Sequence, residues 1–212
     1  FGSSHKQFDN SYPISPTLNS LYSILAEQNF MKLYQKKYFE ISHSSEVFNG
    51  FKLLGKLEYS DRQPVTNTSD FTLNNVNHRV YSTNTPWIYE GSNASFEGHQ
   101  ALIFTLGINY TIDQKYASLP YKTIMGSIYP PIGITYTKAI SGILGSDADF
   151  DLIKIKTNYS QNFGLVGRST IKIEYNHFLN SNKVYFNDYI HYSGIKTIFF
   201  ADGSNSFHLL DY

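Results

Sequence analysis

The chain of 212 residues contains no cysteine, which excludes disulfide bonds, thiol catalysis and cysteine-ligated metals together. Methionine and tryptophan are scarce, with two Met and a single Trp, Trp87. An excess of charge is also missing, because Lys plus Arg and Asp plus Glu both number 17. A balanced charge gives no reason to expect a nucleic-acid or acidic partner. We therefore expect no nucleic-acid partner, and no motif calls for a cofactor.

Long hydrophobic runs are absent as well, since no segment approaches the ~18 apolar residues of a membrane helix. Residues 1–10 lack the basic start and the apolar stretch of a signal peptide. Aromatic residues are abundant instead, at 17% of the chain, with 18 Tyr and 16 Phe. Transmembrane β-barrels concentrate such rings in girdles at both membrane interfaces. A Tyr-rich secreted sandwich or carbohydrate-binding module is the alternative that this composition leaves open.

The segment Gly98–Ile112 has the clearest periodicity in the chain. One set of alternate residues is mostly large and apolar: Leu102, Phe104, Leu106, Ile108, Tyr110 and Ile112. The interleaved residues become smaller and more polar along the segment. Side chains alternate across a strand, so one face of this strand would be apolar and the other could contact water. A tilted strand of about 9–11 residues crosses a bilayer, and this segment is long enough. We interpret it as one strand of an outer-membrane β-barrel.

The same period of two recurs along the chain and predicts eight or nine strands in antiparallel, up-and-down order. The strands are expected at 31–41, 51–60, 98–112, 132–141, 151–160 and 165–178, with shorter ones at 184–192, 195–201 and 206–212. Tight turns are expected at 142–149 and 180–183. Residues 1–29 are predicted to be a polar segment with a short helix at 16–28, which Ser15-Pro16 would start. Residues 30–212 would hold the barrel strands, with a long loop at 61–97. The predicted fold class is all-β: part of an antiparallel transmembrane outer-membrane β-barrel with a short N-terminal helix.

Charged residues occupy the alternate positions of several predicted strands, where they would suit a wet lumen. The candidates for lumen-facing side chains are Lys52, Lys56, Glu58, Lys154, Lys172 and Glu174. They would either tune a pore or form a network of ion pairs that plugs it, and the sequence favours neither. The predicted loops carry aromatic residues suited to contact with a partner protein: Trp87, Tyr89, Phe96, Tyr116 and Tyr121.

The sequence contains only weak candidates for metal-binding or catalytic motifs. Asp147, Asp149 and Asp151 alternate as in a calcium loop, but the required glycine and bidentate glutamate are missing, which favours a solvated turn over a calcium site. The chain has no HExxH and no GxSxG motif. Ser60, Ser169 and His177 are the candidates for a membrane-embedded hydrolase, and polar wall residues are the simpler interpretation. We expect no metal site and no enzymatic activity.

Three segments resemble a known family: LLGKLEYSDRQP (53–64), GHQALIFTLGINYTIDQKYASLP (98–120) and YPPIGITYTKAISGILGSDADFD (129–151). FNDYIHYSG (186–194) and SFHLLDY (206–212) are also similar. The family is the uncharacterised outer-membrane barrel family of the Bacteroidota that carries an N-terminal carboxypeptidase-regulatory-like domain. The resemblance implies an antiparallel barrel in the outer membrane, and it assigns no catalytic or ligand residue. The chain lacks the regulatory-like domain and the family's final strands, so we expect it to be part of a longer polypeptide.

The function expected on these grounds is that of a structural or transport- or assembly-associated outer-membrane barrel in a Gram-negative bacterium. Its expected partners are outer-membrane lipid and other outer-membrane or periplasmic proteins. The alternative is a soluble, secreted, β-rich module that binds carbohydrate or protein through exposed aromatic rings. The two differ in whether the apolar face of residues 102–112 contacts lipid or a protein core.

Overall fold

The computed structural model describes residues 1–8, 14–69, 71–73, 82, 84, 97–118, 121–191, 194–195 and 207–208. The chain divides into two compact units. Unit 1 contains residues 1–38, 60–100 and 185–212, and unit 2 contains residues 39–59 and 101–184. The strands β2, β3 and β4 each contribute residues to both units. The two units are described separately below.

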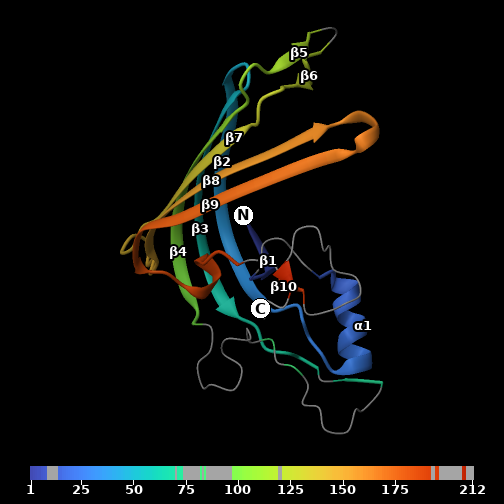
Figure 1. The fold of residues 1–212 in the computed structure, drawn as a ribbon. Coiled ribbons are helices and arrows are strands. Elements are labelled where there is room, and N and C mark those ends of the chain that lie inside the picture. The colour runs from blue at the N-terminus through green and yellow to red at the C-terminus, as the bar shows by residue number, and fades with distance from the viewer. Residues whose placement is uncertain are drawn as a thin grey trace. The chain divides into compact units, whose positions relative to one another are not determined.

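Strands dominate the described part of the chain (Figure 1). They are β1 (Gly2–Gln7), β2 (Leu33–Phe48), β3 (Phe51–Pro64), β4 (His99–Tyr110), β5 (Lys115–Ala117), β6 (Thr123–Gly126), β7 (Ile132–Ala139), β8 (Asp149–Asn162), β9 (Arg168–Lys183), β10 (Gly194–Ile195) and β11 (Phe207–His208). The helical elements are α1 (Pro16–Ala26) and the 3-10 turns η2 (Gly164–Val166) and η3 (Phe186–Asp188). In the residues described, no helix is both long and apolar enough to cross a membrane. The predicted all-β class is confirmed.

Seven strands form one sheet in the order β1-β2-β3-β4-β7-β8-β9. The pairs β1–β2, β4–β7, β7–β8 and β8–β9 are all antiparallel, as the sequence predicts. β1 and β9 are the end strands, so among the described residues the sheet is open and does not close into the expected barrel. β5 and β6 form a separate antiparallel ribbon in the connection between the strands predicted at 98–112 and 132–141.

The alternation in the sequence locates the central strands well, and the differences lie at their ends. β9 continues through the turn predicted at 180–183, because Asn180 and Asn182 donate side-chain hydrogen bonds to Asp149 (3.1 and 2.9 Å) and remain in the ladder. β3 reaches Pro64, so the predicted loop at 61–97 begins at residue 65. In place of the strand predicted at 184–192, the chain forms η3.

The first residues of the chain were predicted to lack regular structure, but they form β1. Its six residues pair with the start of β2, from Gly2 with Tyr38 to Gln7 with Leu33. This strand has no alternation of apolar and polar residues, because it consists of polar residues such as Ser3, Ser4 and His5. The strands predicted at 195–201 and 206–212 coincide only with the two-residue strands β10 and β11, which pair in parallel. The rest of those two segments lies outside the described residues.

The helix of unit 1 begins where the sequence predicts. Ser15 is the N-cap, its hydroxyl accepts a hydrogen bond from Leu18 N (3.3 Å), and Pro16 occupies the first helical position. Two of the leucines of this helix do not face the interior, since Leu21 and Leu25 are each 52% exposed. The buried residue is Asn19, whose side-chain oxygen accepts hydrogen bonds from the backbone N–H groups of Phe30 and Met31 (both 2.9 Å). A polar contact therefore fixes this helix.

Unit 1 contains a buried ion pair beside a small aromatic cluster. Phe8 packs against Tyr34 and Phe186, with ring centroids 5.1 Å apart in both pairs. Arg62 Nη1 lies 2.7 Å from Asp188 Oδ1, and both side chains are 5% exposed. Arg62 Nε also donates to Ser60 Oγ (3.1 Å). The pair fastens η3 to the end of β3, which explains why residues 186–188 form a turn there and not a strand.

Replacing Arg62 by Met should destabilise the protein by about 3–5 kcal/mol, because Asp188 would be left as a buried charge without its cation. The measurement is the free energy of unfolding. Lys183→Met is the matched control, since Lys183 and Asp147 form a looser pair (3.6 Å) with side chains 53% and 44% exposed. Its expected cost is about 0.5 kcal/mol or less. Equal losses from both variants would contradict the structural role of the buried pair.

Candidate functional site

The register of unit 2 gathers apolar side chains on one face of β4, β7, β8 and β9. Cross-strand partners share a face, so each row of partners can be read from the pairing. One row is Leu106, Tyr136, Ile153 and His177, and the next is Ile108, Ile134, Ile155 and Tyr175. A third row is Tyr110, Ile132, Thr157 and Ile173, and Tyr159 with Ile171 makes a fourth. We call these rows the apolar wall.

The apolar wall is not buried. Ile134 is 36% exposed and Ile155 is 38% exposed, even though both lie on strands flanked by neighbours. Ile173, on β9, is 60% exposed. In Figure 1, β8 and β9 form the long orange hairpin on which much of the wall lies. Large apolar side chains that remain exposed in adjacent rows indicate a surface that meets an apolar surrounding.

Polar residues bound the wall at both of its ends. At one end, Lys138 pairs with Asp151 in the register, and Lys138 Nζ lies 2.9 Å from Asp151 Oδ1. Tyr136 OH donates to the same oxygen (2.6 Å). At the other end, Gln161 pairs with Ser169. The ten-residue step from Asp151 to Gln161 spans about 33 Å of strand, or about 25 Å of height at a barrel tilt of ~40°. That height matches the apolar band of outer-membrane barrels, about 25 Å.

Aromatic rings gather near the ends of the wall. Phe48 and Phe51 stack at the β2–β3 turn with centroids 4.7 Å apart, and both rings contact Tyr110 edge-on (6.2 and 6.0 Å). In unit 2, Tyr59 OH donates to Leu144 O (3.1 Å). Rings with an apolar body and a hydrogen-bonded hydroxyl are typical of membrane interfaces.

All six residues predicted to face a lumen lie on the opposite face of unit 2. Lys154 and Glu174 belong to rows that also contain Gly107 and Asn109, and Lys172 pairs with Asn158. A Cβ added to Gly107 would come within 3.2 Å of Leu54 Cβ, which places Leu54 on this face. Lys52, Lys56 and Glu58 alternate with Leu54 and so share the face. Their exposure to a lumen stays a prediction.

Part of this polar face forms ion pairs. Lys56 Nζ lies 3.0 Å from Glu58 Oε2 and 3.2 Å from Glu40 Oε2. Glu58 is only 4% exposed. A lysine shared by two carboxylates is the type of contact expected from a charge network that fills a lumen.

The same face is apolar and buried toward the Lys138 end, which the sequence analysis missed. Ala139, Phe150 and Leu152 are at most 3% exposed, and Phe150 packs edge-on against Phe178 (5.9 Å). Ile103 pairs with Ala139, which pairs with Phe150. The sequence contains the alternation that indicates this buried face, because Phe150 and Leu152 alternate with Asp149 and Asp151. The aspartates also fit a solvated turn, which is the structure that the sequence analysis predicted for this segment.

Two of the five aromatic residues predicted to contact a partner lie in the described part of the chain. Tyr116, in β5, is 48% exposed, and Tyr121, next to the β5–β6 ribbon, is 82% exposed. Lys122 Nζ lies 4.9 Å from the centre of the Tyr116 ring and 2.8 Å from Glu46 Oε2. Trp87, Tyr89 and Phe96 lie outside the described residues. The exposure of Tyr116 and Tyr121 is compatible with contact, and the contact itself stays a prediction.

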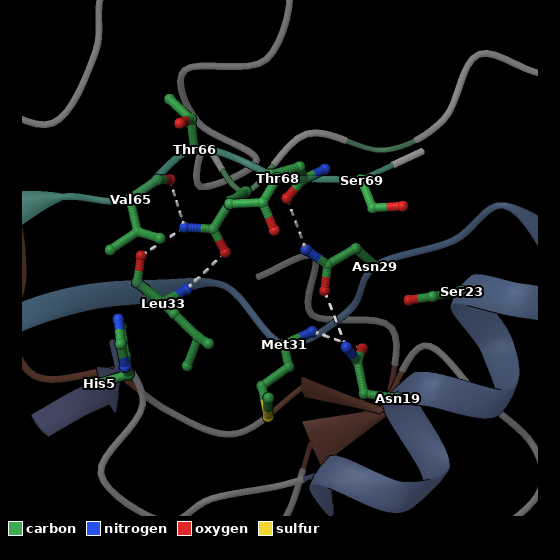
Figure 2. A pocket seen from close by; sticks show the side chains of 12 residues that line it. His5, Asn19, Ser23, Asn29, Met31, Leu33, Val65, Thr66, Thr68 and Ser69 are labelled. Carbon is green, nitrogen blue, oxygen red and sulfur yellow. Dashed lines mark hydrogen bonds between the residues drawn. The ribbon is translucent and has the colours of Figure 1, made fainter. Parts of the chain in front are cut away.

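Unit 1 contains a polar cavity of about 440 Å³ (Figure 2). Its lining has no Lys, Arg, Asp or Glu and consists of His5, Asn19, Ser23, Asn29, Met31, Leu33, Val65, Thr66, Asn67, Thr68, Ser69 and Asn84. Figure 2 shows the side chain of Asn29 pointing toward Asn19, whose Nδ2 donates to Asn29 Oδ1 (2.9 Å). A neutral lining of this size suits a small uncharged polar ligand better than an ion.

The amides of this cavity are largely occupied by the protein itself. Asn84 Oδ1 accepts from Leu33 N (2.9 Å), while Asn84 Nδ2 donates to Leu33 O (2.5 Å) and Val65 O (2.8 Å). One side chain thus bridges the start of β2 and the residue after β3, much as a peptide group would. Sequence reasoning missed Asn84, because one asparagine in an Asn-rich loop gives no signal.

The candidates for metal binding and hydrolysis do not form a site. Among the residues described, no three His, Asp or Glu side chains converge as metal ligands would. Asp147, Asp149 and Asp151 contact Lys183, Asn180 and Lys138 respectively. Ser60 Oγ is bound by Arg62, and Ser169 and His177 stand eight residues apart on β9, or about 26 Å of strand.

Comparison with known protein families identifies one domain that spans the whole chain. A family profile described as a family of unknown function (DUF5686), C-terminal domain, matches residues 1–212. No curated protein and no solved structure matches the chain significantly. The profile covers the apolar wall, the polar face and the cavity alike. The chain therefore belongs to the DUF5686 family of unknown function, as its C-terminal domain.

Proposed function

We propose that unit 2 forms part of the lipid-facing wall of an outer-membrane β-barrel, and that the protein is a structural or transport- or assembly-associated component of the bacterial envelope. The observation that carries this proposal is the apolar wall. Its rows run across four hydrogen-bonded strands, and residues such as Ile134, Ile155 and Ile173 remain 36–60% exposed. A soluble monomer rarely leaves so large a contiguous apolar surface in water.

The height and the ends of the wall support lipid as the surrounding. Its polar limits, the Lys138–Asp151 pair and Gln161, lie about one hydrocarbon thickness apart for a tilted strand. Lys138 can extend its stem over the apolar rows while its ammonium group stays at the interface with Asp151. A surface that docks on a protein core would not need polar limits at this spacing.

The polar face supports a filled interior over an open channel. Lys56 is shared by the carboxylates of Glu58 and Glu40, and Leu54 packs close to Gly107 on the same face. Such contacts favour the plugged alternative for the predicted lumen residues. Partners are then expected to bind the loops, where Tyr116 and Tyr121 are exposed.

The second candidate function is that of a soluble β-rich module that binds a small neutral ligand. The polar cavity of unit 1 favours it, since the size and the uncharged lining suit a sugar or a similar polyol. Among the lining residues there is no Phe, Tyr or Trp, so the ring stacking expected from the sequence has no counterpart in the described cavity. The apolar wall has no role in this alternative.

Fractionation of cells that express the full-length protein distinguishes the two functions. We expect the protein in the outer-membrane fraction, resistant to extraction by carbonate or urea and soluble only with detergent. Recovery of the folded wild-type protein from the soluble fraction without detergent would overturn the membrane proposal and favour the binding module.

Arginine substitutions on β4 and β7 test how the wall is oriented. Ile134→Arg places a charge in the second of the four rows, near the middle of the wall, and should destabilise the barrel by about 2–4 kcal/mol. Leu106→Arg, one row from the Lys138–Asp151 limit, should cost less because the penalty falls toward the interface. Thr135→Arg, next to Ile134 but on the polar face, should be milder still. The measurement is the free energy of unfolding in lipid vesicles.

The order of the three costs is the decisive result of this series. Equal damage from Ile134→Arg and Thr135→Arg would indicate two buried faces and a soluble core. A larger cost for Leu106→Arg than for Ile134→Arg would place the middle of the bilayer elsewhere on the wall.

A further inference from the structure

Three lysines on the polar face of unit 2 form a group without a carboxylate partner. They are Lys52 of β3 and Lys154 and Lys156 of β8, and we call them the lysine cluster. In the described part of the chain, none of their ammonium groups forms an ion pair with an Asp or Glu. Lys52 and Lys156 are exposed and Lys154 is half-buried, so a dissolved ligand can reach the cluster.

The contacts between β3 and β4 place Lys52 opposite Asn109. Phe51 and Tyr110 are in ring contact, and the backbone of Thr111 donates a hydrogen bond to Gly50 O (2.8 Å). On the other face, Leu54 lies against Gly107. These contacts all give the same antiparallel register, in which Lys52 is the cross-strand partner of Asn109. The two residues therefore share the polar face.

The same row continues across the sheet to Lys156. Asn109 pairs with Gly133, and Gly133 pairs with Lys156. Neighbouring strands lie about 4.8 Å apart, so the backbones of Lys52 and Lys156 are separated by about 14 Å of sheet. The flexible four-carbon stem of each lysine can bring its ammonium group over the two residues between them. Lys154 lies two residues along β8 on the same face and can reach the same position.

Gly133 allows the Lys156 side chain to lie along this row. A Cβ at position 133 would come within 3.1 Å of Lys156 Cγ and 3.2 Å of Lys156 Cε, so the lysine stem crosses directly over the glycine. The stem thus extends toward β4 and away from Glu174, its cross-strand partner on β9. Glu174 Oε1 accepts a hydrogen bond from Asn176 Nδ2 (2.9 Å) instead.

The surroundings of the lysine cluster favour a bound anion. The residues that β4 and β7 place beside it on this face are uncharged: Thr105, Gly107, Asn109, Gly133, Thr135 and Thr137. Under the proposed function this face lines a narrow lumen, and low-dielectric walls strengthen the attraction between an excess of one charge and its counter-ions. We propose that Lys52, Lys154 and Lys156 bind a small multivalent oxyanion of the phosphate class. This inference rests on the proposed function, which encloses the face.

A single small anion fits this arrangement better than an acidic polypeptide does. The three lysines surround one position, whereas an extended acidic segment spaces its alternate carboxylates about 7 Å apart and needs cations along its whole length. Lysine ammonium groups are point charges that commonly bind phosphate. Asn109 lies between Lys52 and Lys156 and supplies an amide that can donate a hydrogen bond to an oxyanion.

Titration of the full-length protein in detergent with inorganic pyrophosphate tests the site. Calorimetry at low salt should show binding, and Lys52→Gln, Lys154→Gln and Lys156→Gln should each weaken it about tenfold or more, the loss expected for one charge-assisted contact. Lys183→Gln is the matched control and should keep the wild-type affinity, because Lys183 pairs with Asp147 at the other end of β9. Absence of binding to the wild-type protein, or equal affinity in all four variants, would overturn the inference.

Gly133→Ala separates a defined site from general attraction by positive charge. The variant keeps every charge, but its Cβ would displace the Lys156 stem, so the affinity for pyrophosphate should fall. Gly55→Ala should bind as the wild type does, since a Cβ at Gly55 meets no atom within 4 Å. Both variants are compared after electrophoresis shows the heat-modifiable mobility of the wild type. Unchanged affinity in folded Gly133→Ala would contradict the site, and if this variant does not fold, the three lysine variants decide.

Hexaglutamate, titrated in the same way, tests the class of the ligand. Tighter binding of hexaglutamate than of pyrophosphate would assign the lysine cluster to an acidic polypeptide and overturn the inference. A protein that is inserted in the outer membrane but binds no pyrophosphate would overturn the inference alone. A wild-type protein that is soluble without detergent would overturn the membrane proposal, and with it the enclosed lumen on which this inference rests.

Discussion

The structure of unit 2 depends on the cross-strand register of β4, β7, β8 and β9. A shift of one residue in any of these pairings would move a whole set of side chains to the opposite face. The observed register aligns Ile108, Ile134 and Ile155 across three strands. It also aligns small and charged residues behind them, including Gly107, Thr135 and Lys154. The apolar wall exists only because these separate alternations are in phase.

The two units are stabilised by different kinds of contact. Among its described residues, unit 2 buries apolar side chains at one end of its polar face, around Ala139 and Phe150, and leaves the apolar wall exposed. Unit 1 relies on buried polar contacts. Arg62 pairs with Asp188, and the amides of Asn19 and Asn84 satisfy backbone groups at chain turns. Buried polar contacts of this kind fix specific connections between segments in place of a large core.

The sequence predicts the strands that form the wall and the two faces of the sheet, because a period of two survives in β4, β7 and β8. It does not predict elements held by side-chain contacts from distant segments. β1 lacks an apolar alternation and is defined by pairing with β2. Residues 180–183 resemble a turn in composition, yet Asp149 holds two of their asparagines in a strand. The cavity of unit 1 depends in the same way on Asn84, which reaches residues 51 positions away at Leu33.

The central claim is that the apolar wall contacts lipid, and its most direct test is the collision accessibility of spin labels. Labels at positions 134 and 155, and at positions 135 and 154 on the other face, are measured in full-length protein reconstituted in vesicles. The account predicts that labels at 134 and 155 collide with oxygen, which partitions into lipid, and are protected from a water-soluble nickel complex. Labels at 135 and 154 should lack this preference for oxygen. Low accessibility to both reagents at 134 and 155, or free access of the nickel complex there, would contradict the account.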